Sequence, residues 1–431
     1  MQRNAQKALI EWKNGQGRKP LLLYGARQVG KTYLIREFSK AHYQDTAYFD
    51  LEKQASARAV FDGDLEPKRI IERLGSLIGG PIDLRSTLIV LDEIQASNRA
   101  LASVKYFAEE MPEAHLVCAG SLLGIAVSRE GYSAPVGKVD TLTLFPMGFD
   151  EFLGALDEGL MVKDIKACYE ANERYFLHDK ALDYYRAYLL VGGMPEAVDA
   201  YREKRDFARA QGIQQDILSL YLADMAKYAK PYETARIIEV WNSIPSQLAK
   251  ENKKFQYKVV KPGGRASQYL GALQWLEQAG LINLCVQANA GQMPLALHEN
   301  RDNYKVFQAD TGLLSARIGL SPLSLFDGQG EGGPNLGALV ENYVAQALAA
   351  NRVGLHYWTS DGKAEVDFLF EDKGARLIPL EVKSSGNVRS KSLAVFMQKY
   401  RPEVAYRLST KNFGLENGIK SIPLYAAFCI S

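Results

Sequence analysis

The chain has 431 residues, of which 47% are hydrophobic and 24% are charged, and its formal net charge is +2. This composition is that of an ordinary globular protein, and the length predicts about two to four domains because one hydrophobic core rarely grows that large. A net charge so close to zero gives no indication of nucleic-acid binding by the chain as a whole, so only local charge clusters can indicate it.

Membrane, secreted and zinc proteins are disfavoured as classes. The uncharged stretch from Ala114 to Ser128 is too short for a membrane span and contains two glycines, so we expect no transmembrane helix. The N-terminus lacks an apolar signal core, which predicts a cytoplasmic protein. The four cysteines and five histidines show no ligand spacing, so we expect neither a zinc site nor a disulfide framework.

Short apolar runs alternate with helical segments from Pro20 to about Asp150. The segments "LLLY", "TAYFDL", "TLIVLDE" and "HLVCAGS" predict buried parallel strands, each followed by a helix. We therefore expect an α/β fold over residues 1–155, with the doubly wound parallel sheet of a P-loop NTPase.

The segment "LLLYGARQVGKT" has the spacing of a phosphate-binding loop between a strand and a helix. Glycines let the backbone amides wrap the phosphates, and the helix N-terminus favours their negative charge. The lysine can reach the β- and γ-phosphates, and the threonine hydroxyl can ligate Mg²⁺. The alternative is a chance Gly-rich turn. The predicted ATP-binding residues are Gly25, Ala26, Arg27, Gln28, Val29, Gly30, Lys31 and Thr32.

An acidic pair, Asp92 and Glu93, ends the apolar segment "TLIVLDE". Asp92 can hold the Mg²⁺ shell together with Thr32, and Glu93 can polarise the water that attacks the γ-phosphate. Ser121, at the end of "HLVCAGS", would lie next to the phosphate loop if the two strands are neighbours, where it could contact the γ-phosphate or the water. The alternative for Ser121 is a helix cap.

Four segments, "GARQVGKT", "LDEIQ", "CAGS" and "LFPMGFDEFL", together resemble the AAA-type ATPase core of many bacterial and archaeal proteins of unassigned role. In that family a C-terminal region of unknown function follows, here similar in "GGMPEAV", "YKVFQADTGLL", "GALVENYV", "AEVDFLF" and "IPLEVKSS". The family commonly has Gly-Arg where this chain has Gly137-Lys138. Since lysine lacks the planar fork of arginine, an arginine-finger role at Lys138 is doubtful, and Arg129 is the alternative.

Long amphipathic helices are expected over residues 156–326, with a winged helix-turn-helix at about 232–290. Tyr269, Leu273 and Leu276 lie on one helical face, and Gly280 can end that helix. Nine Lys or Arg stand against three Glu from Lys227 to Arg265, a cluster that could neutralise the phosphates of a DNA duplex. The alternatives are a helical lid with a solvated basic face and a protein contact.

The third region, residues 327–431, resembles a small α/β domain of the restriction-endonuclease-like fold. Its helix, three strands, helix and strand would bring together an acid and a Glu-x-Lys pair, the residue types that hold Mg²⁺ in metal-dependent nucleases. Two alternatives stay open: an exposed ion pair on an edge strand, and a retained fold without cleavage. The residues of this second site are Glu341, Asp367, Glu381 and Lys383.

Three functions fit these patterns. The first is an ATPase that hydrolyses Mg-ATP to drive or gate a conformational change, with DNA as a candidate target. The second is an ATP-gated, metal-dependent nuclease, and the third is a non-hydrolysing nucleotide switch that binds DNA or a partner protein. The sequence leaves the biological process, the target, the oligomeric state and the arginine finger undetermined.

Overall fold

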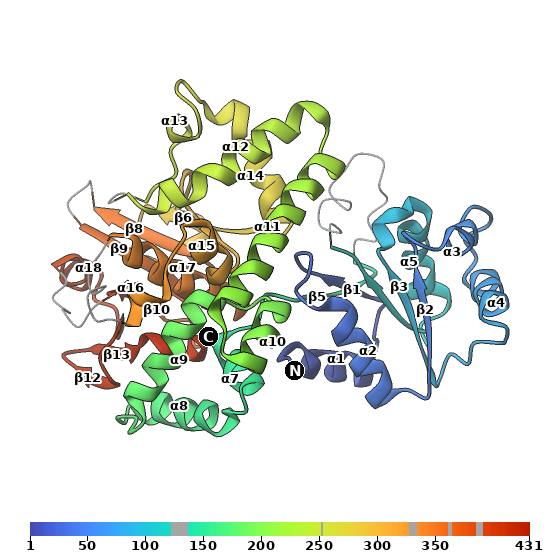
Figure 1. Cartoon of the computed structure of the whole chain (residues 1–431), viewed down its shortest axis with the longest axis horizontal. Coiled ribbons are helices and arrows are strands. Elements are labelled where there is room, and N and C mark those ends of the chain that lie inside the picture. The colour runs from blue at the N-terminus through green and yellow to red at the C-terminus, as the bar shows by residue number, and fades with distance from the viewer. Residues whose placement is uncertain (122–136, 251–252, 327–333, 361–363, 385–390) are drawn as a thin grey trace. The chain divides into compact units, whose positions relative to one another are not determined.

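The computed structural model describes residues 1–121, 137–250, 253–326, 334–360, 364–384 and 391–431. It divides into two compact units (Figure 1). The N-terminal unit comprises residues 2–145 and 278–280, and the C-terminal unit comprises residues 146–277 and 281–431, with Met1. The domain boundaries that the sequence suggests, after residues 155 and 326, stay predictions.

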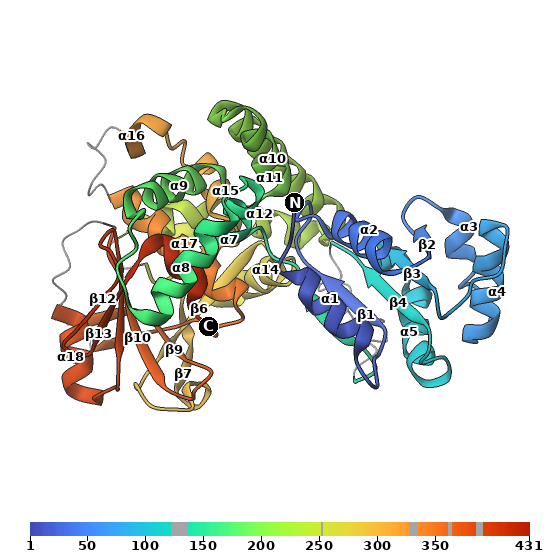
Figure 2. The same ribbon diagram turned by 90° about the horizontal axis from the view of Figure 1, so that it is seen from below.

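A five-stranded parallel sheet in the order β2-β3-β4-β1-β5 forms the centre of the N-terminal unit. All six residues of β3 are buried, as a parallel sheet covered on both faces requires. Both ribbon views place α3 and α4 beyond β2 (Figures 1 and 2). The elements are α1 (Ala5–Asn14), β1 (Leu21–Tyr24), α2 (Lys31–His42), β2 (Asp45–Asp50), α3 (Ala55–Ala59), α4 (Pro67–Ile78), β3 (Thr87–Asp92), η1 (Ile94–Ala96), α5 (Asn98–Glu110), β4 (His115–Ala119) and β5 (Asp140–Thr143).

Local sequence signals begin and end these helices. Pro67 opens α4, where its missing N–H is not needed, and Gly79 follows the helix in the left-handed conformation. Ser97 caps α5 by accepting a hydrogen bond from the backbone N–H of Ala100 at 3.2 Å. Such a cap stabilises a helix by about 1 kcal/mol. Helix and strand boundaries at the edge of the sheet are therefore set by the local sequence.

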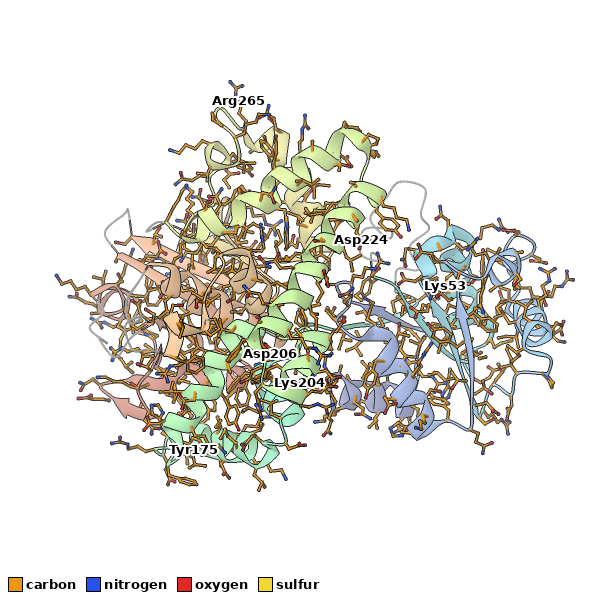
Figure 3. The ribbon with its side chains drawn as sticks, in the orientation of Figure 1. Lys53, Tyr175, Lys204, Asp206, Asp224 and Arg265 are labelled. Carbon is orange, nitrogen blue, oxygen red and sulfur yellow. The ribbon has the colours of Figure 1, made fainter. Side chains whose placement is uncertain are left out.

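The C-terminal unit begins with helices that form its outer layer. Asp206 caps α11 through the backbone N–H groups of Ala208 and Arg209, and Lys204 and Asp206 mark the turn from α10 to α11 in Figure 3. The helices are α7 (Phe149–Ala155), α8 (Gly159–Ala171), α9 (His178–Val191), α10 (Pro195–Lys204), α11 (Phe207–Tyr228), α12 (Pro231–Leu248), α13 (Tyr257–Val260), α14 (Ala266–Gln278), η2 (Leu295–His298), α15 (Thr311–Arg317), α16 (Pro322–Phe326), α17 (Pro334–Ala350), α18 (Lys391–Tyr400) and η3 (Leu424–Cys429).

An eight-stranded mixed sheet, in the order β12-β13-β11-β10-β9-β8-β6-β7, completes the C-terminal unit. The hairpin of β6 and β7 follows α14, and β6 pairs in parallel with β8, so one sheet spans the middle and last parts of the sequence. The strands are β6 (Ile282–Ala288), β7 (Glu299–Gln308), β8 (His356–Ser360), β9 (Ala364–Glu371), β10 (Leu377–Val382), β11 (Ala405–Ser409), β12 (Gly414–Glu416) and β13 (Ile419–Pro423).

Helix α17 is buried on most sides, in keeping with its nearly uninterrupted apolar sequence. Its Asn342 side chain accepts a hydrogen bond from Gln308 N at 2.7 Å and donates one to Gln308 O at 3.0 Å. These two bonds fix α17 against the end of β7. Across the described residues, no helix has a stretch long and apolar enough to cross a bilayer.

Candidate functional site

The phosphate-binding loop connects β1 to α2 through backbone conformations that glycine permits. Gly25 has φ +146°, and a Cβ there would lie 2.4 Å from the carbonyl oxygen of Leu144. Gly30, with φ +92°, immediately precedes α2. Any side chain at Gly25 would collide with backbone, so this position requires glycine for steric reasons.

Lys31 is buried at the first position of α2 and turns back over the loop. Its Nζ donates hydrogen bonds of 2.8 Å to the carbonyl oxygens of Gly25 and Ala26. Burial lowers the pKa of Lys31 to about 8, against the opposing effects of Glu93 and Asp92. Lys31 is therefore a buried ammonium group held at the loop by two backbone carbonyls and close to the charges of Glu93 and Asp92.

The buried carboxylate of Asp92, at the end of β3, receives three hydrogen bonds. The Thr32 hydroxyl donates one to Oδ2 at 2.9 Å, the Tyr48 hydroxyl donates a second to Oδ2, and Glu93 N donates a third to Oδ1 at 3.0 Å. The two residues predicted to hold Mg²⁺ therefore contact each other. Sequence reasoning missed Tyr48, because no local pattern specifies that its strand pairs with β3.

Glu93 follows Asp92 in the left-handed conformation, with φ +50°. A non-glycine residue there carries backbone strain of about 1 to 3 kcal/mol, a feature that recurs at functional sites. Its Oε2 accepts hydrogen bonds from Gln95 and, at 3.4 Å, from Ser121 Oγ. Because β4 pairs with β1, Ser121 lies at the edge of the sheet that carries the phosphate loop.

Of the two candidates for an arginine finger, only Lys138 lies among the described residues. Lys138 Nζ forms an ion pair of 2.9 Å with Glu109, and both side chains are nearly half exposed. Arg129 lies outside the described residues. The structure therefore identifies no finger among the residues that it describes.

The second site predicted from the sequence lies inside the C-terminal unit. Asp367 on β9 accepts a hydrogen bond of 2.8 Å from the backbone N–H of Val382 on β10. Glu381 is 4% exposed and forms an ion pair of 2.6 Å with Lys383. Glu341 reaches the same cluster from α17, since its charge acts on Asp367. All four residues are thus brought together.

The edge-strand interpretation of Glu381 and Lys383 is wrong. Strand β10 lies between β9 and β11, so it is a central strand, and the side chain of Glu381 is buried. Burial raises the pKa of Asp367 well above its usual value, and the charges of Glu341 and Glu381 raise it further. The cluster is consequently a buried group of acids whose charges repel.

Two lysines that the sequence did not suggest compensate these acids. Lys305 on β7 is fully buried and lies 2.5 Å from Glu365, and Lys253 pairs with Glu341. Burial lowers the pKa of Lys305, but Glu341 and the other carboxylates outweigh this effect and raise the pKa above its ordinary value. A lysine within the apolar segment "YKVF" was the only signal for it.

The acids are not arranged as a metal site. Among the described residues, no group of three or more His, Cys, Asp or Glu side chains is placed to hold a metal ion. Nevertheless, Oε2 of Glu341 and Oε2 of Glu381 are buried and make no hydrogen bond. Carboxylate oxygens are the preferred ligands of Mg²⁺, but these acids are not placed to hold it together.

The basic segment from Lys227 to Arg265 runs from the end of α11 through α12 and α13 to the residue before α14. Tyr269, Leu273 and Leu276 are buried, as their spacing predicts. Arg265 points away from the unit at the edge of Figure 3 and is exposed. Lys253, by contrast, is only 14% exposed in its side chain and pairs with Glu341, so it does not belong to the solvated basic face.

One family model covers the residues of the first site. Residues 17–153 match the AAA domain. This AAA domain holds the phosphate loop, Asp92 and Glu93, and its parallel sheet is that of a P-loop NTPase, which is a nucleotide-binding fold. Residues 182–324 and 336–427 match two models described as domains of unknown function, DUF8612 and DUF4143.

Solved structures resemble the chain only distantly. A Walker-type ATPase of Pyrococcus abyssi aligns over 73% of this chain and 94% of its own, with 16% identity and a TM-score of 0.45. The ORC1 protein of Aeropyrum pernix in complex with DNA aligns over 74% of this chain and 93% of its own, with 14% identity and a TM-score of 0.28. The ORC2 protein of Aeropyrum pernix aligns over 73% of this chain and 91% of its own, with 13% identity and a TM-score of 0.37. Similarities at this level carry no argument about this chain, and no curated protein matches it.

Proposed function

We propose that the AAA domain binds Mg-ATP and hydrolyses it. The observation that carries this proposal is the hydrogen bond between Thr32 and Asp92, which joins the phosphate loop to the acidic end of β3. Lys31 would leave the two loop carbonyls for the β- and γ-phosphates. Thr32 and Asp92 would hold Mg²⁺, which neutralises the charge that develops on the phosphates.

Glu93 is the proposed general base. Its carboxylate lies beside Asp92 and accepts the Ser121 hydrogen bond, so a water between them would be oriented by both side chains. In this arrangement Ser121 senses the γ-phosphate through the same water. The left-handed backbone of Glu93 supports the role, since strained non-glycine backbone recurs at functional sites.

Steady-state ATP turnover with Mg²⁺ tests this proposal. Glu93→Gln should lower kcat about 100-fold or more and leave ATP binding intact, because loss of a positioned base typically costs 10²- to 10⁴-fold. Glu37→Gln, an exposed acid on α2, is the matched control. Wild-type protein that binds Mg-ATP without turning it over would instead support a non-hydrolysing switch.

The nucleotide state would drive or gate a conformational change in the C-terminal unit. The chain passes between the two units after Met1, after Phe145, after Glu277 and after Gly280, so both ends of the segment 278–280 are tied to the C-terminal unit. A change in the N-terminal unit therefore has four covalent routes out of it. A second copy of the chain or a partner protein could receive the same signal.

DNA is the proposed target, bound through a winged helix. In support, α12, α13 and α14 are followed by the β6–β7 hairpin, and Lys254 forms a bridge with Lys305 on β7, the strand pattern of a winged helix-turn-helix. Arg265→Ala should weaken duplex binding. It should also reduce the slope of log affinity against log salt concentration by about one, the contribution of a single phosphate contact. A fluorescence titration over a range of salt concentrations measures both.

A second candidate function is metal-dependent nucleic-acid cleavage at Glu341, Asp367, Glu381 and Lys383. The buried pairing of Asp367 with the backbone of Val382 favours it, because this bond holds the acid beside the Glu-x-Lys strand. The order α17, β8, β9, β10, α18 and β11 is also the one that the nuclease-like fold requires. The wild type should nick plasmid DNA in the presence of Mn²⁺, and Glu381→Gln should not. If the wild type cleaves no DNA with any divalent metal tested, that result argues against this function.

A further inference from the structure

We propose that Arg3 is a positioning residue for nucleotide binding, because its guanidinium group fixes the backbone of the phosphate loop. In this role Arg3 touches neither the nucleotide nor Mg²⁺, since it acts through the loop. The inference deepens the proposed ATP site and rests on it. Arg3 stands far ahead of the loop in the sequence, so no local pattern indicates the role.

The guanidinium group of Arg3 joins two backbone carbonyl groups of the N-terminal unit. Its Nη1 donates a hydrogen bond of 2.7 Å to Val29 O, and its Nη2 donates one of 2.6 Å to Phe145 O. Arg3 is buried, with 6% of its surface exposed. A guanidinium group is planar and presents its N–H groups in fixed directions, so the two bonds also fix the two carbonyl groups relative to each other. Arg3 therefore holds the loop to the segment that ends at Phe145.

The bond to Val29 determines where one loop amide points. Val29 O belongs to the same planar, trans peptide unit as the N–H of Gly30, and in such a unit the C=O and the N–H point in opposite directions. Because Arg3 holds the carbonyl group on one side, the Gly30 amide is directed to the other. Backbone amides are the groups with which such a loop binds phosphates. The orientation of this peptide unit is therefore a requirement of the proposed ATP site.

The loop needs this support because its backbone is left-handed on both sides of Val29. Gln28 has φ +66° and Gly30 has φ +92°. A non-glycine residue in this region is strained, and it persists only where its surroundings hold it. Val29 between them is fully buried, and the hydrogen bond from Arg3 to its carbonyl group is one of the contacts that hold the turn.

The second carbonyl group lies in a segment that packs on the first residue of the loop. Leu144 N donates a hydrogen bond of 2.8 Å to Tyr24 O, and Leu144 O lies so close to Gly25 that a Cβ there would be 2.4 Å from it. Phe145, the next residue, accepts the bond from Arg3. This segment thus contacts the start of the loop directly and the later part of the loop through Arg3. Loss of the arginine would release the later part alone.

The test is titration of the full-length protein with a fluorescent ATP analogue in the presence of Mg²⁺, together with chemical denaturation. Arg3→Lys keeps the positive charge but lacks the planar fork, so its dissociation constant should be at least about fivefold higher than that of the wild type. Arg3→Ala removes every donor of the side chain and should bind more weakly still. In both variants the stoichiometry should stay that of the wild type, because the site is loosened and not lost.

Steady-state ATP turnover separates positioning of the loop from a part in the chemical step. The loop amides bind the phosphates in the ground state as well as in the transition state, so Arg3→Lys should raise KM and change kcat less than about threefold. A fall in kcat beyond that limit with KM unchanged would overturn the inference.

Arg99→Lys is the matched control. Arg99 also donates to two backbone carbonyl groups, those of Phe61 at 2.6 Å and Gly63 at 2.5 Å, neither of which belongs to the phosphate loop. This variant should bind the ATP analogue like the wild type, even where denaturation shows a lower free energy of unfolding. The inference is overturned if Arg99→Lys weakens binding as much as Arg3→Lys does, or if the loss in Arg3→Lys is smaller than fivefold.

Failure of this inference and failure of the proposed function give different results. A wild type that binds no nucleotide would overturn both, whereas equal affinity of the wild type and Arg3→Lys would reject only the role of Arg3. If Arg3→Ala does not fold, Arg3→Lys carries the test, because it keeps the charge and nearly the length of the side chain. A lower free energy of unfolding with unchanged ATP affinity would make Arg3 a structural residue and reject the positioning role.

Discussion

The Thr32 hydroxyl donates a hydrogen bond of 2.9 Å to Oδ2 of Asp92. This bond links the first turn of α2 to the end of β3, two elements that are separated by β2, α3 and α4 in the sequence. The two proposed Mg²⁺ ligands are thus in contact. Under the proposed function, the carboxylate and the hydroxyl that would hold the metal already lie side by side.

Replacing Thr32 by valine should separate metal use from nucleotide binding. Thr32→Val removes the hydroxyl at nearly constant volume, so it removes one Mg²⁺ ligand and leaves the loop amides and Lys31 in place. Mg²⁺-dependent turnover should fall at least about tenfold, whereas ATP affinity without Mg²⁺ should change less than about threefold. Thr32→Ser keeps the hydroxyl and should retain turnover. If ATP turnover by Thr32→Val depends on Mg²⁺ as that of the wild type does, the Thr32 hydroxyl is not a ligand of the metal.

Tyr48→Phe should destabilise the N-terminal unit. The variant loses a hydrogen bond to the buried carboxylate of Asp92, and a bond to a charged group contributes about 1.5 kcal/mol or more. Chemical denaturation should report a free energy of unfolding lower by about that amount. Tyr106→Phe on α5 is the control and should be nearly neutral. If the free energy of unfolding falls by less than about 0.5 kcal/mol, the hydrogen bond from Tyr48 to Asp92 does not stabilise the N-terminal unit.

ATP affinity should fall as the pH rises from 7 to 9. The pKa of Lys31 is about 8 in the free protein because the side chain is buried. Lys31 is therefore charged below pH 8 and increasingly neutral above it, and only the charged form attracts phosphate. Linkage then predicts binding about tenfold weaker at pH 9 than at pH 7. Lys31→Arg stays charged across this range and should lose most of the pH dependence, as titrations at both pH values would show.

Lys305→Met should destabilise the C-terminal unit more at pH 8 than at pH 5. The variant leaves buried carboxylates without their lysine, and removal of one partner of a buried ion pair costs about 3 kcal/mol. Lys305 lowers the pKa of Asp367, which burial and two neighbouring acids hold well above its usual value. Without Lys305 the folded-state pKa of Asp367 rises further above the unfolded value, so the folded state holds more protons and stability falls as pH rises. Denaturation at the two pH values measures this, with Lys180→Met as a surface control. Equal losses at both pH values would contradict the electrostatic explanation.

The sequence predicts what is local and misses what tertiary structure brings together. The phosphate loop, the strand ending in Asp92 and the burial of Tyr269 on α14 follow from spacing within short segments. Tyr48 and Lys305 could not be assigned, because their partners Asp92 and Glu365 lie on other strands whose pairing no local pattern specifies. Strand β7 was missed for a related reason: its exposed first half is polar, and only its second half is buried.

Nucleotide binding to Lys31→Ala tests the central claim most directly. Titration of wild type, Lys31→Ala and the surface variant Lys40→Ala with a fluorescent ATP analogue, in the presence of Mg²⁺, gives three dissociation constants. The wild type and Lys40→Ala should bind alike, and Lys31→Ala should bind at least about tenfold more weakly, because the buried ammonium group is lost. Equal affinity for all three proteins would show that the phosphate loop of this AAA domain is not its nucleotide site.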